Sequence, residues 1–254
     1  MKYAYAGDRE ISCNILTYII SKGYKPSLLL VNDNTSTTHA DKLIEISGLN
    51  DDKIIRGKQF TNPENIEKLK ALNLDYIIGI HFPLIIPNEV LDCPKIGFLN
   101  LHPAYLPYNK GWHTPTWAIL DKTTYGATLH FMSEKLDAGD IIHQKALEVN
   151  KDDTANSLYE RVLKLEEQVF YEALPDILSL NPTRIKQIEQ GTSHNRKDLF
   201  KINEISLEEN IRAGDLIDKL RALTTNRVDE FAYFIHNSKK YALEIKITEK
   251  EHEL

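Results

Sequence analysis

Short apolar segments divide the first hundred residues, and this pattern limits the fold more than any other feature of the chain. Residues 28–31 and 76–80 are apolar runs, and Ile11, Ile15 and Ile19 fall at helical spacing before them. Apolar strands that alternate with amphipathic helices are typical of a parallel sheet covered on both faces. The chain is therefore predicted to have an α/β fold. The expected strands are 2–6, 28–31, 53–56, 76–80 and 96–101, and the expected helices are 11–19, 41–47 and 63–72.

The pattern changes in the second half of the chain, where apolar and polar residues alternate. The expected elements are strands 126–132 and 141–149, helices 152–180 and 211–223, and a β-hairpin within 231–247. Asp153 or Thr154 is the expected N-cap of the long helix. Residues 181–205 are polar and mostly irregular. We therefore expect a large domain of residues 1–185 and a C-terminal extension of residues 186–254.

Composition disfavours several classes of function. The 254 residues carry a formal net charge of -6, which argues against the large basic surface that nucleic acids require. No apolar run is long enough to span a membrane, and the start of the chain lacks the apolar core of a signal peptide. Cys13 and Cys93 have neither metal-site nor disulfide spacing, which suits the reducing cytoplasm. We therefore expect a cytoplasmic protein that acts on a small molecule, with no metal, nucleic acid or membrane partner.

A polar motif lies at the carboxyl end of the last of the apolar strands. Asn100 and His102 are two residues apart, so that both side chains point to the same side of the strand. A carboxamide can donate a hydrogen bond to a developing oxyanion, and an imidazole moves a proton near neutral pH. Asp137, in a Leu-Asp-Ala-Gly-Asp turn, adds a carboxylate that can orient such an imidazole. Together these residue types predict acyl transfer.

Each residue of this motif also has an ordinary structural interpretation. Asn100 can cap a turn, His102 can end a strand, and Asp137 can be a simple turn residue. Because open parallel sheets bind ligands beyond the carboxyl ends of their strands, the position of the group favours the catalytic interpretation. His130 and His143, on the strands that flank Asp137, are interpreted as structural or surface histidines rather than as a second base.

The motif resembles the signature of the folate-dependent formyltransferases. The resemblance rests on Asn100-Leu101-His102-Pro103, Leu106-Pro107, Gly111 and Leu136-Asp137-Ala138-Gly139-Asp140. It implies a Rossmann-like core with a mostly parallel sheet, here followed by a small C-terminal helix and hairpin, and N10-formyltetrahydrofolate as formyl donor. It also implies that Asn100 holds the formyl oxygen, that His102 accepts a proton from the attacking amine, and that Asp137 holds or assists this imidazole.

In this family a segment after the fourth strand binds the pterin ring of the folate through backbone groups. Here that segment is residues 81–87. Backbone groups suit a flat heterocycle with alternating donors and acceptors. The resemblance implies folate contacts by Phe82, Leu84, Ile85, Ile86 and Asp140. The alternative is an apolar loop that only packs on the core.

The flanking sequence indicates which amine receives the formyl group. Residues 6–12, the loop 111–115 and the C-terminal hairpin resemble the nucleotide-sugar N-formyltransferases, which formylate dTDP-linked amino deoxysugars for surface glycans such as the O-antigen of lipopolysaccharide. The expected acceptor is dTDP-4-amino-4,6-dideoxyglucose. The short tail and the acidic charge disfavour tRNA. The alternatives are a transformylase of another amine, such as glycinamide ribonucleotide, and a non-catalytic nucleotide-binding protein.

Several residues are predicted to contact this nucleotide-sugar. They are Gly7, Arg9, Tyr105, Lys110, Trp112 and His113. Gly7 opens a strand-to-helix turn whose N–H groups favour phosphate, and Arg9 adds a charge-assisted hydrogen bond. The alternatives are a surface ion pair for Arg9 and a packed aromatic lid for the loop at Trp112.

The C-terminal hairpin is predicted to form a subunit interface. Phe231, Tyr233 and Tyr241 place aromatic side chains on an exposed pair of strands. Such a surface favours pairing with a second chain. We therefore expect a homodimer.

Overall fold

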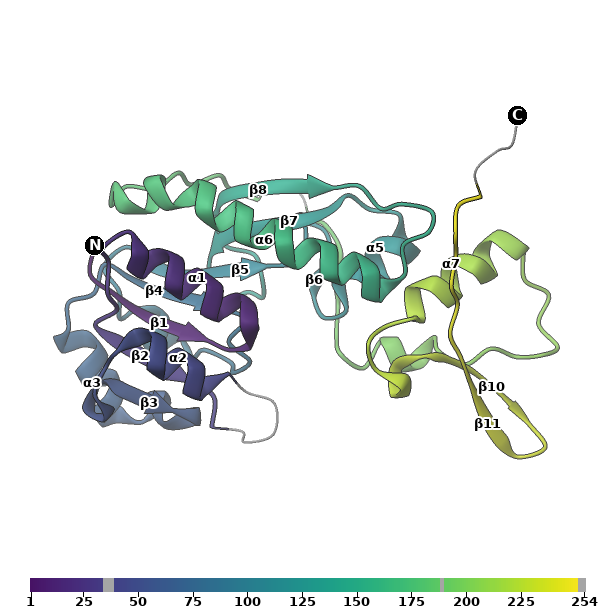
Figure 1. The fold of residues 1–254 in the computed structure, drawn as a ribbon, viewed down its shortest axis with the longest axis horizontal. Helices are drawn as coiled ribbons and strands as arrows, with labels where there is room; N and C mark the ends of the chain where they lie inside the picture. Colours follow the sequence, from purple (N-terminus) through teal and green to yellow (C-terminus); the bar gives the residue numbers. More distant parts are fainter. Residues whose placement is uncertain (34–38, 188–189, 251–254) are drawn as a thin grey trace. The chain divides into compact units, whose positions relative to one another are not determined.

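The computed structural model describes residues 1–33, 39–187 and 190–250 (Figure 1). The chain forms two compact units. Unit 1 comprises Met1–His102, Thr128–Gln144 and Glu166–Ile188, and unit 2 comprises Pro103–Ala127, Lys145–Leu165 and Glu189–Leu254. The boundary expected at residue 185 stays a prediction.

Within the described residues, the central sheet has seven strands in the order β3-β2-β1-β4-β5-β7-β8. They are β1 (Tyr3–Gly7), β2 (Leu28–Val31), β3 (Ile54–Arg56), β4 (Tyr76–Ile80), β5 (Gly97–His102), β7 (Tyr125–Phe131) and β8 (Ile141–Leu147). The strands from β3 to β5 pair in parallel, and β7 pairs antiparallel with β5. The mostly parallel α/β sheet predicted from the apolar segments is confirmed.

Helices cover both faces of the parallel strands in unit 1 (Figure 1). They are α1 (Arg9–Ser21), α2 (Ala40–Ser47), α3 (Pro63–Ala71), α4 (Asn88–Leu91) and the second half of α6 (Ala155–Leu178). One face, with Ala4, Leu28 and Ile77, packs with α3 and α4 in an apolar cluster. On the other face, the hydroxyl groups of Tyr5 and Tyr76 donate to carbonyl groups of α1 and α6. Burial on both faces explains why these strands are continuously apolar.

Unit 2 contains smaller elements. They are β6 (Lys110–Gly111), α5 (Thr114–Asp121), β9 (Ser193–His194), α7 (Ala213–Leu223), β10 (Ala232–His236) and β11 (Lys239–Leu243). The predicted hairpin is β10–β11, and its tip residues Asn237 and Ser238 have φ angles of 49° and 60°, as a type I′ turn requires. Helix α5 was not predicted, because nearly all of its residues are buried and the helix therefore shows no polar face.

The remaining short 3₁₀ helices are η1 (Asp51–Lys53), η2 (Gly57–Thr61), η3 (Leu199–Lys201) and η4 (Val228–Glu230). The long helix α6 is preceded by Thr154, whose Oγ1 accepts a hydrogen bond from the backbone N–H of Ser157 at 3.2 Å. Thr154 rather than Asp153 is therefore the N-cap. None of the helices in the described ranges has the length and apolar character that crossing a membrane requires.

Candidate functional site

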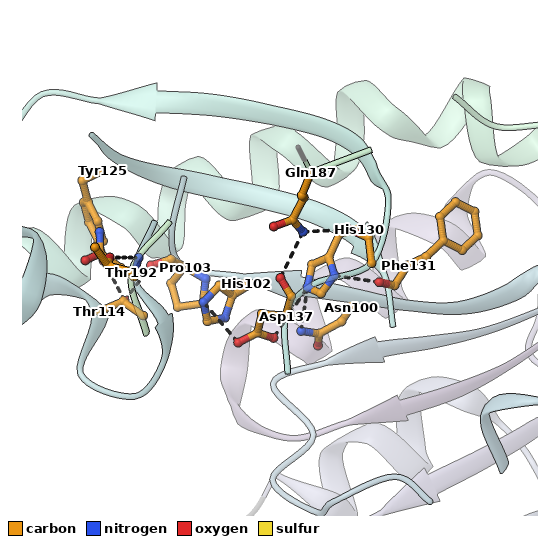
Figure 2. A network of polar contacts seen from close by, with 12 residues as sticks. Asn100, His102, Pro103, Thr114, Tyr125, His130, Phe131, Asp137, Gln187 and Thr192 are labelled. Carbon is orange, nitrogen blue, oxygen red and sulfur yellow. Dashed lines mark hydrogen bonds and ion pairs between the residues drawn. The ribbon is translucent and has the colours of Figure 1, made fainter. Parts of the chain in front are cut away.

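The antiparallel pairing of β5 with β7 brings polar side chains together in unit 1. In its register Asn100 lies opposite His130, and His102 lies opposite Thr128. Residues directly opposite each other on neighbouring strands share one face of the sheet, as do residues two apart on one strand. Asn100, His102 and His130 therefore lie on the same face (Figure 2).

His130 orients the carboxamide of Asn100. Its Nε2 lies 3.3 Å from Nδ2 of Asn100, and its Nδ1 lies 2.8 Å from the carbonyl oxygen of Phe131. A carbonyl oxygen can only accept a hydrogen bond, so Nδ1 of the neutral imidazole carries the proton and Nε2 accepts from Asn100. One hydrogen of the Asn100 amino group is thereby used, and the other can serve a reacting oxygen.

Asp137 lies between the two histidines (Figure 2). Its Oδ2 is 3.6 Å from Nε2 of His102, and its Oδ1 is 3.8 Å from Nε2 of His130. The side chains of Asp137 and His102 are only 10% and 8% exposed, so water screens this charge weakly. A positive charge on His102 would face the carboxylate directly. The structure thus brings together the three residues that the sequence motif singled out.

The turn that carries Asp137 folds back tightly on β7. Asp137 has a φ of 48°, in the left-handed region. A Cβ atom on Gly139 would lie 1.9 Å from the carbonyl oxygen of Phe131, so this position requires glycine. The carboxylate of Asp140 lies 3.7 Å from Nη1 of Arg184. Close packing therefore determines the path of the turn.

Residues 82–86 follow β4 and belong to no helix or strand, whereas the carbonyl oxygen of Pro87 accepts hydrogen bonds from the backbone N–H groups of Val90 and Leu91 in α4. Phe82, Leu84 and Ile86 pack against the apolar core, whereas Ile85 is 93% exposed. The three packed side chains thus make the core contacts expected of an apolar loop. A flat ligand at this segment would meet backbone groups and Ile85.

A buried pair holds the beginning of this segment. Nε2 of His81 lies 3.0 Å and 2.9 Å from the carboxylate oxygens of Glu166 on α6, and both side chains are almost fully buried. His81 has a φ of 50°, which is uncommon for a residue with a Cβ atom. This pair was not predicted from the sequence. Its one sequence signal is Glu166 itself, a glutamate at an apolar position of α6.

Residues 30–174, more than half of the chain, match the family model described as formyl transferase. The chain belongs to the formyl transferase family. Residues 198–249 match a second model, the N-formyltransferase dimerization C-terminal domain.

The relatives of this chain include formyltransferases with different acceptors. The methionyl-tRNA formyltransferase of Listeria monocytogenes serotype 4a is 33% identical over 135 residues, which are 53% of this chain and 43% of the relative. The chain thus aligns with less than half the length of that relative. The crystal structure of a 4-N formyltransferase from Francisella tularensis is 25% identical with a TM-score of 0.83, and the match covers 98% of this chain and 99% of that chain.

A further solved structure is the N-formyltransferase from Helicobacter canadensis in complex with folinic acid and dTDP-3-aminofucose. It is 22% identical with a TM-score of 0.69, and the match covers 94% of this chain and 86% of that chain. At this identity the likeness concerns the fold. The Rossmann-like formyltransferase fold predicted from the sequence is confirmed.

Four of the predicted acceptor residues lie in unit 2. Tyr105 and Lys110 are half-buried, whereas Trp112 is 48% exposed and has the guanidinium of Arg196 5.3 Å from its ring centroid. His113 is nearly buried, and its Nδ1 lies 3.8 Å from Oε2 of Glu230. Burial lowers the pKa of His113, and the charge of Glu230 opposes this effect.

The other predicted acceptor residues, Gly7 and Arg9, lie in unit 1 at the turn between β1 and α1. Oδ1 of Asp8 accepts hydrogen bonds from the backbone N–H of Arg9 at 2.8 Å and of His39 at 3.0 Å. This carboxylate occupies the N-terminus of α1, so a phosphate there would face a negative charge. A Cβ atom on Gly7 would lie 1.9 Å from Oγ of Ser12, which explains the glycine by close packing.

Metal ligands are not grouped in the described ranges: no set of three or more His, Cys, Asp or Glu residues there could hold an ion. Cys13 and Cys93 are free thiols in buried positions. Burial raises the pKa of both thiols. Both cysteines therefore have less thiolate character than an exposed cysteine.

We expect the stability of unit 2 to depend on pH through His113. Because its pKa is below 6.5 in the folded chain, the unfolded chain binds more protons as the pH falls below about 6.5, and unit 2 loses stability there. Removing the imidazole in His113→Gln should make the thermal midpoint fall less steeply between roughly pH 7 and pH 5. Tryptophan fluorescence measures this, since both tryptophans, Trp112 and Trp117, lie in unit 2.

The matched control is His143→Gln. His143 is a half-exposed histidine in unit 1, where it pairs with Glu172 at 2.9 Å. This variant should leave the pH dependence of the tryptophan signal as in the wild type. Equal slopes for His113→Gln and the wild type would contradict the role of His113.

Proposed function

We propose that this protein transfers a formyl group from N10-formyltetrahydrofolate to the amino group of a dTDP-linked amino deoxysugar. The observation that carries the proposal is the cluster of Asn100, His102 and Asp137 within a chain of the formyl transferase family. This cluster combines a hydrogen-bond donor, a proton acceptor and a carboxylate, which are the groups that acyl transfer to an amine requires.

Asn100 supplies the donor for the formyl oxygen. One hydrogen of its Nδ2 is bonded to His130, which holds the carboxamide in place. The second hydrogen donates to the formyl oxygen as negative charge develops there. Loss of one such donor typically lowers the rate by about 10²- to 10³-fold.

His102 moves the proton. The amine nitrogen forms a bond to the formyl carbon and loses a proton, which the imidazole of His102 accepts. The same proton passes to the folate nitrogen as the bond between that nitrogen and the formyl carbon breaks, so His102 returns to its neutral form. Meanwhile the carboxylate of Asp137, 3.6 Å from Nε2, stabilises the imidazolium.

N10-formyltetrahydrofolate supplies a formyl group on a nitrogen that can leave. Residues 82–86 fit its flat ring, because their backbone groups belong to no helix or strand and Ile85 offers an exposed apolar side chain. We propose that Phe82, Leu84 and Ile86 give this segment its shape by packing on the core. Asp140, in the same turn as Asp137, completes the proposed folate contacts.

The acceptor that we propose is dTDP-4-amino-4,6-dideoxyglucose, as a step toward a surface glycan such as the O-antigen, in the cytoplasm. Its support is the likeness to the Francisella tularensis 4-N formyltransferase over nearly the full length of both chains. The alignment with the methionyl-tRNA formyltransferase covers 135 residues, and a net charge of -6 disfavours tRNA. The complex of the Helicobacter canadensis enzyme with dTDP-3-aminofucose supports the nucleotide.

The proposed acceptor contacts are Tyr105, Lys110, Trp112 and His113, together with Gly7 and Arg9, where the carboxylate of Asp8 disfavours a phosphate. We further propose residues 1–185 as the catalytic domain and 186–254 as a dimerisation extension. The match of residues 198–249 to an N-formyltransferase dimerization domain supports the extension. Ile235 and Tyr241, 51% and 42% exposed on the hairpin, offer apolar surface for a second copy of the chain.

Formyl transfer can be tested directly. The protein is incubated with N10-formyltetrahydrofolate and, separately, with dTDP-amino sugars bearing the amine at C-3 or C-4, glycinamide ribonucleotide and methionyl-tRNA. Mass spectrometry should detect the formyl increment on a dTDP-sugar. Turnover on glycinamide ribonucleotide or tRNA with none on any sugar would overturn the proposed acceptor, and no turnover on any amine would overturn the reaction.

Two substitutions test the catalytic assignment. Asn100→Ala should lower kcat by about 10²- to 10³-fold, because the oxyanion loses its donor. His102→Asn should abolish turnover while calorimetry still detects folate binding. Asn156→Ala, which removes a surface carboxamide bonded to Glu160, should retain the wild-type rate. A near-normal rate in His102→Asn would show that another group accepts the proton.

The dimer is tested by sedimentation. We expect a dimer at micromolar concentration, and Ile235→Glu should dissociate it by placing a charge on the apolar surface of the hairpin. Leu180→Glu changes a similarly exposed residue in unit 1 and should leave the dimer intact. A wild-type monomer under these conditions would contradict the proposal.

A further inference from the structure

The chain that follows α6 returns to the turn that carries Asp137. The backbone groups of Ile185 and Ile141 exchange two hydrogen bonds, of 2.8 Å and 2.9 Å. Both residues belong to unit 1. This bridge brings Gln187, two residues further along, to the turn before β8 (Figure 2).

Gln187 makes two hydrogen bonds to the backbone of that turn. Its Nε2 donates to the carbonyl oxygen of Asp137 at 3.0 Å and to that of Gly139 at 2.7 Å. Both partners are carbonyl oxygens, so an oxygen in place of Nε2 would be repelled by each of them. The orientation of the carboxamide therefore follows from its surroundings.

The backbone of the turn at Asp137 requires contacts that hold it in place. Asp137 adopts a left-handed conformation, which a residue with a Cβ atom rarely takes unless its surroundings hold it there. The two bonds from Gln187 lie on either side of Ala138, so they hold the backbone that directs the Asp137 side chain. That side chain must keep its Oδ2 near Nε2 of His102, and its Oδ1 lies 3.8 Å from Nε2 of His130.

Arg184, in the same segment after α6, makes further contacts that hold the segment in place. Nη2 of Arg184 donates to the carbonyl oxygen of Ile96 at 2.8 Å, and the guanidinium lies 3.5 Å from the centroid of the Phe131 ring. Nη1 of Arg184 approaches the carboxylate of Asp140. Arg184 thus contacts Phe131, which precedes the turn that carries Asp137, and Asp140, which ends that turn.

We propose that Gln187 is a positioning residue for formyl transfer, holding the backbone of Asp137 so that its carboxylate stays between His102 and His130. This inference rests on the function proposed above for the same site. Gln187 lies outside both regions that match family models, residues 30–174 and 198–249. The connection between the two matched regions thereby contributes directly to the geometry of the site.

Kinetics of Gln187→Leu test the proposal. Leucine is close in size to glutamine but cannot donate a hydrogen bond, so kcat should fall roughly 10- to 100-fold through misplacement of Asp137. KM for the dTDP-sugar should change by less than about threefold, because none of its proposed contacts lies in this turn. Gln187→Glu, which puts a carboxylate against the two carbonyl groups, should lower kcat at least as much.

Histidine ring resonances supply a readout that does not depend on turnover. In long-range ¹H–¹⁵N spectra of Gln187→Leu, the ring signals of His102 and His130 should shift, whereas those of His143 should not. Gln168→Leu is the matched control, since Nε2 of Gln168 donates to a surface glutamate, Glu172, at 2.9 Å. This control should retain the wild-type kcat and the wild-type ring signals of His102 and His130. If Gln187→Leu does not fold, Gln187→Asn, which keeps the carboxamide but shortens its reach, serves instead.

The outcomes separate the two proposals. An active wild type together with Gln187 variants that keep its kcat and its histidine spectra would overturn the positioning role alone. A change in KM with unaltered kcat would overturn it as well. A wild type that formylates no amine would overturn the proposed function, and the histidine spectra would then still show whether Gln187 holds Asp137 in place.

Discussion

The antiparallel pairing of β7 with β5 is the interaction on which the candidate site depends. Its register sets Asn100 opposite His130, so that one side chain supports the other on a single face of the sheet. Because side chains alternate along a strand, a slip of one residue would turn His130 to the opposite face. The carboxamide of Asn100 would then lose its partner, and Asp137 would lose one of the two histidines it faces.

The two histidines near Asp137 have different surroundings and therefore different roles. His130 is held through both ring nitrogens, by the carbonyl group of Phe131 and by Asn100, and it is almost completely buried. It therefore acts as a support. His102, at the end of β5, faces the carboxylate through Nε2, so a proton gained there has a charge to balance it. The carboxylate of Asp137 thus serves the proton transfer at His102, whereas Asn100 and the backbone of Phe131 hold His130.

Much of this arrangement could be predicted from local patterns. The apolar segments predicted the parallel strands, because burial on both faces leaves no polar positions. The spacing of Asn100 and His102 predicted a shared direction, because side chains on a strand repeat every second residue. Helix α5 was not predicted, because it is buried on nearly all sides and has no amphipathic period. The polar segment after α6 gave no sign of its contact with the catalytic turn.

The sequence by itself determined the sheet, the long helix, the hairpin and the residue types of the catalytic motif, since these depend on periodicity and on neighbours in the chain. Only the tertiary structure decided which distant groups meet. His81 and Glu166 are 85 residues apart, Gln187 and Asp137 are 50 apart, and Asn100 and His130 are 30 apart. Such hydrogen bonds follow from strand register and helix packing. They leave no local pattern, because each partner is an ordinary polar residue until the fold removes water from around it.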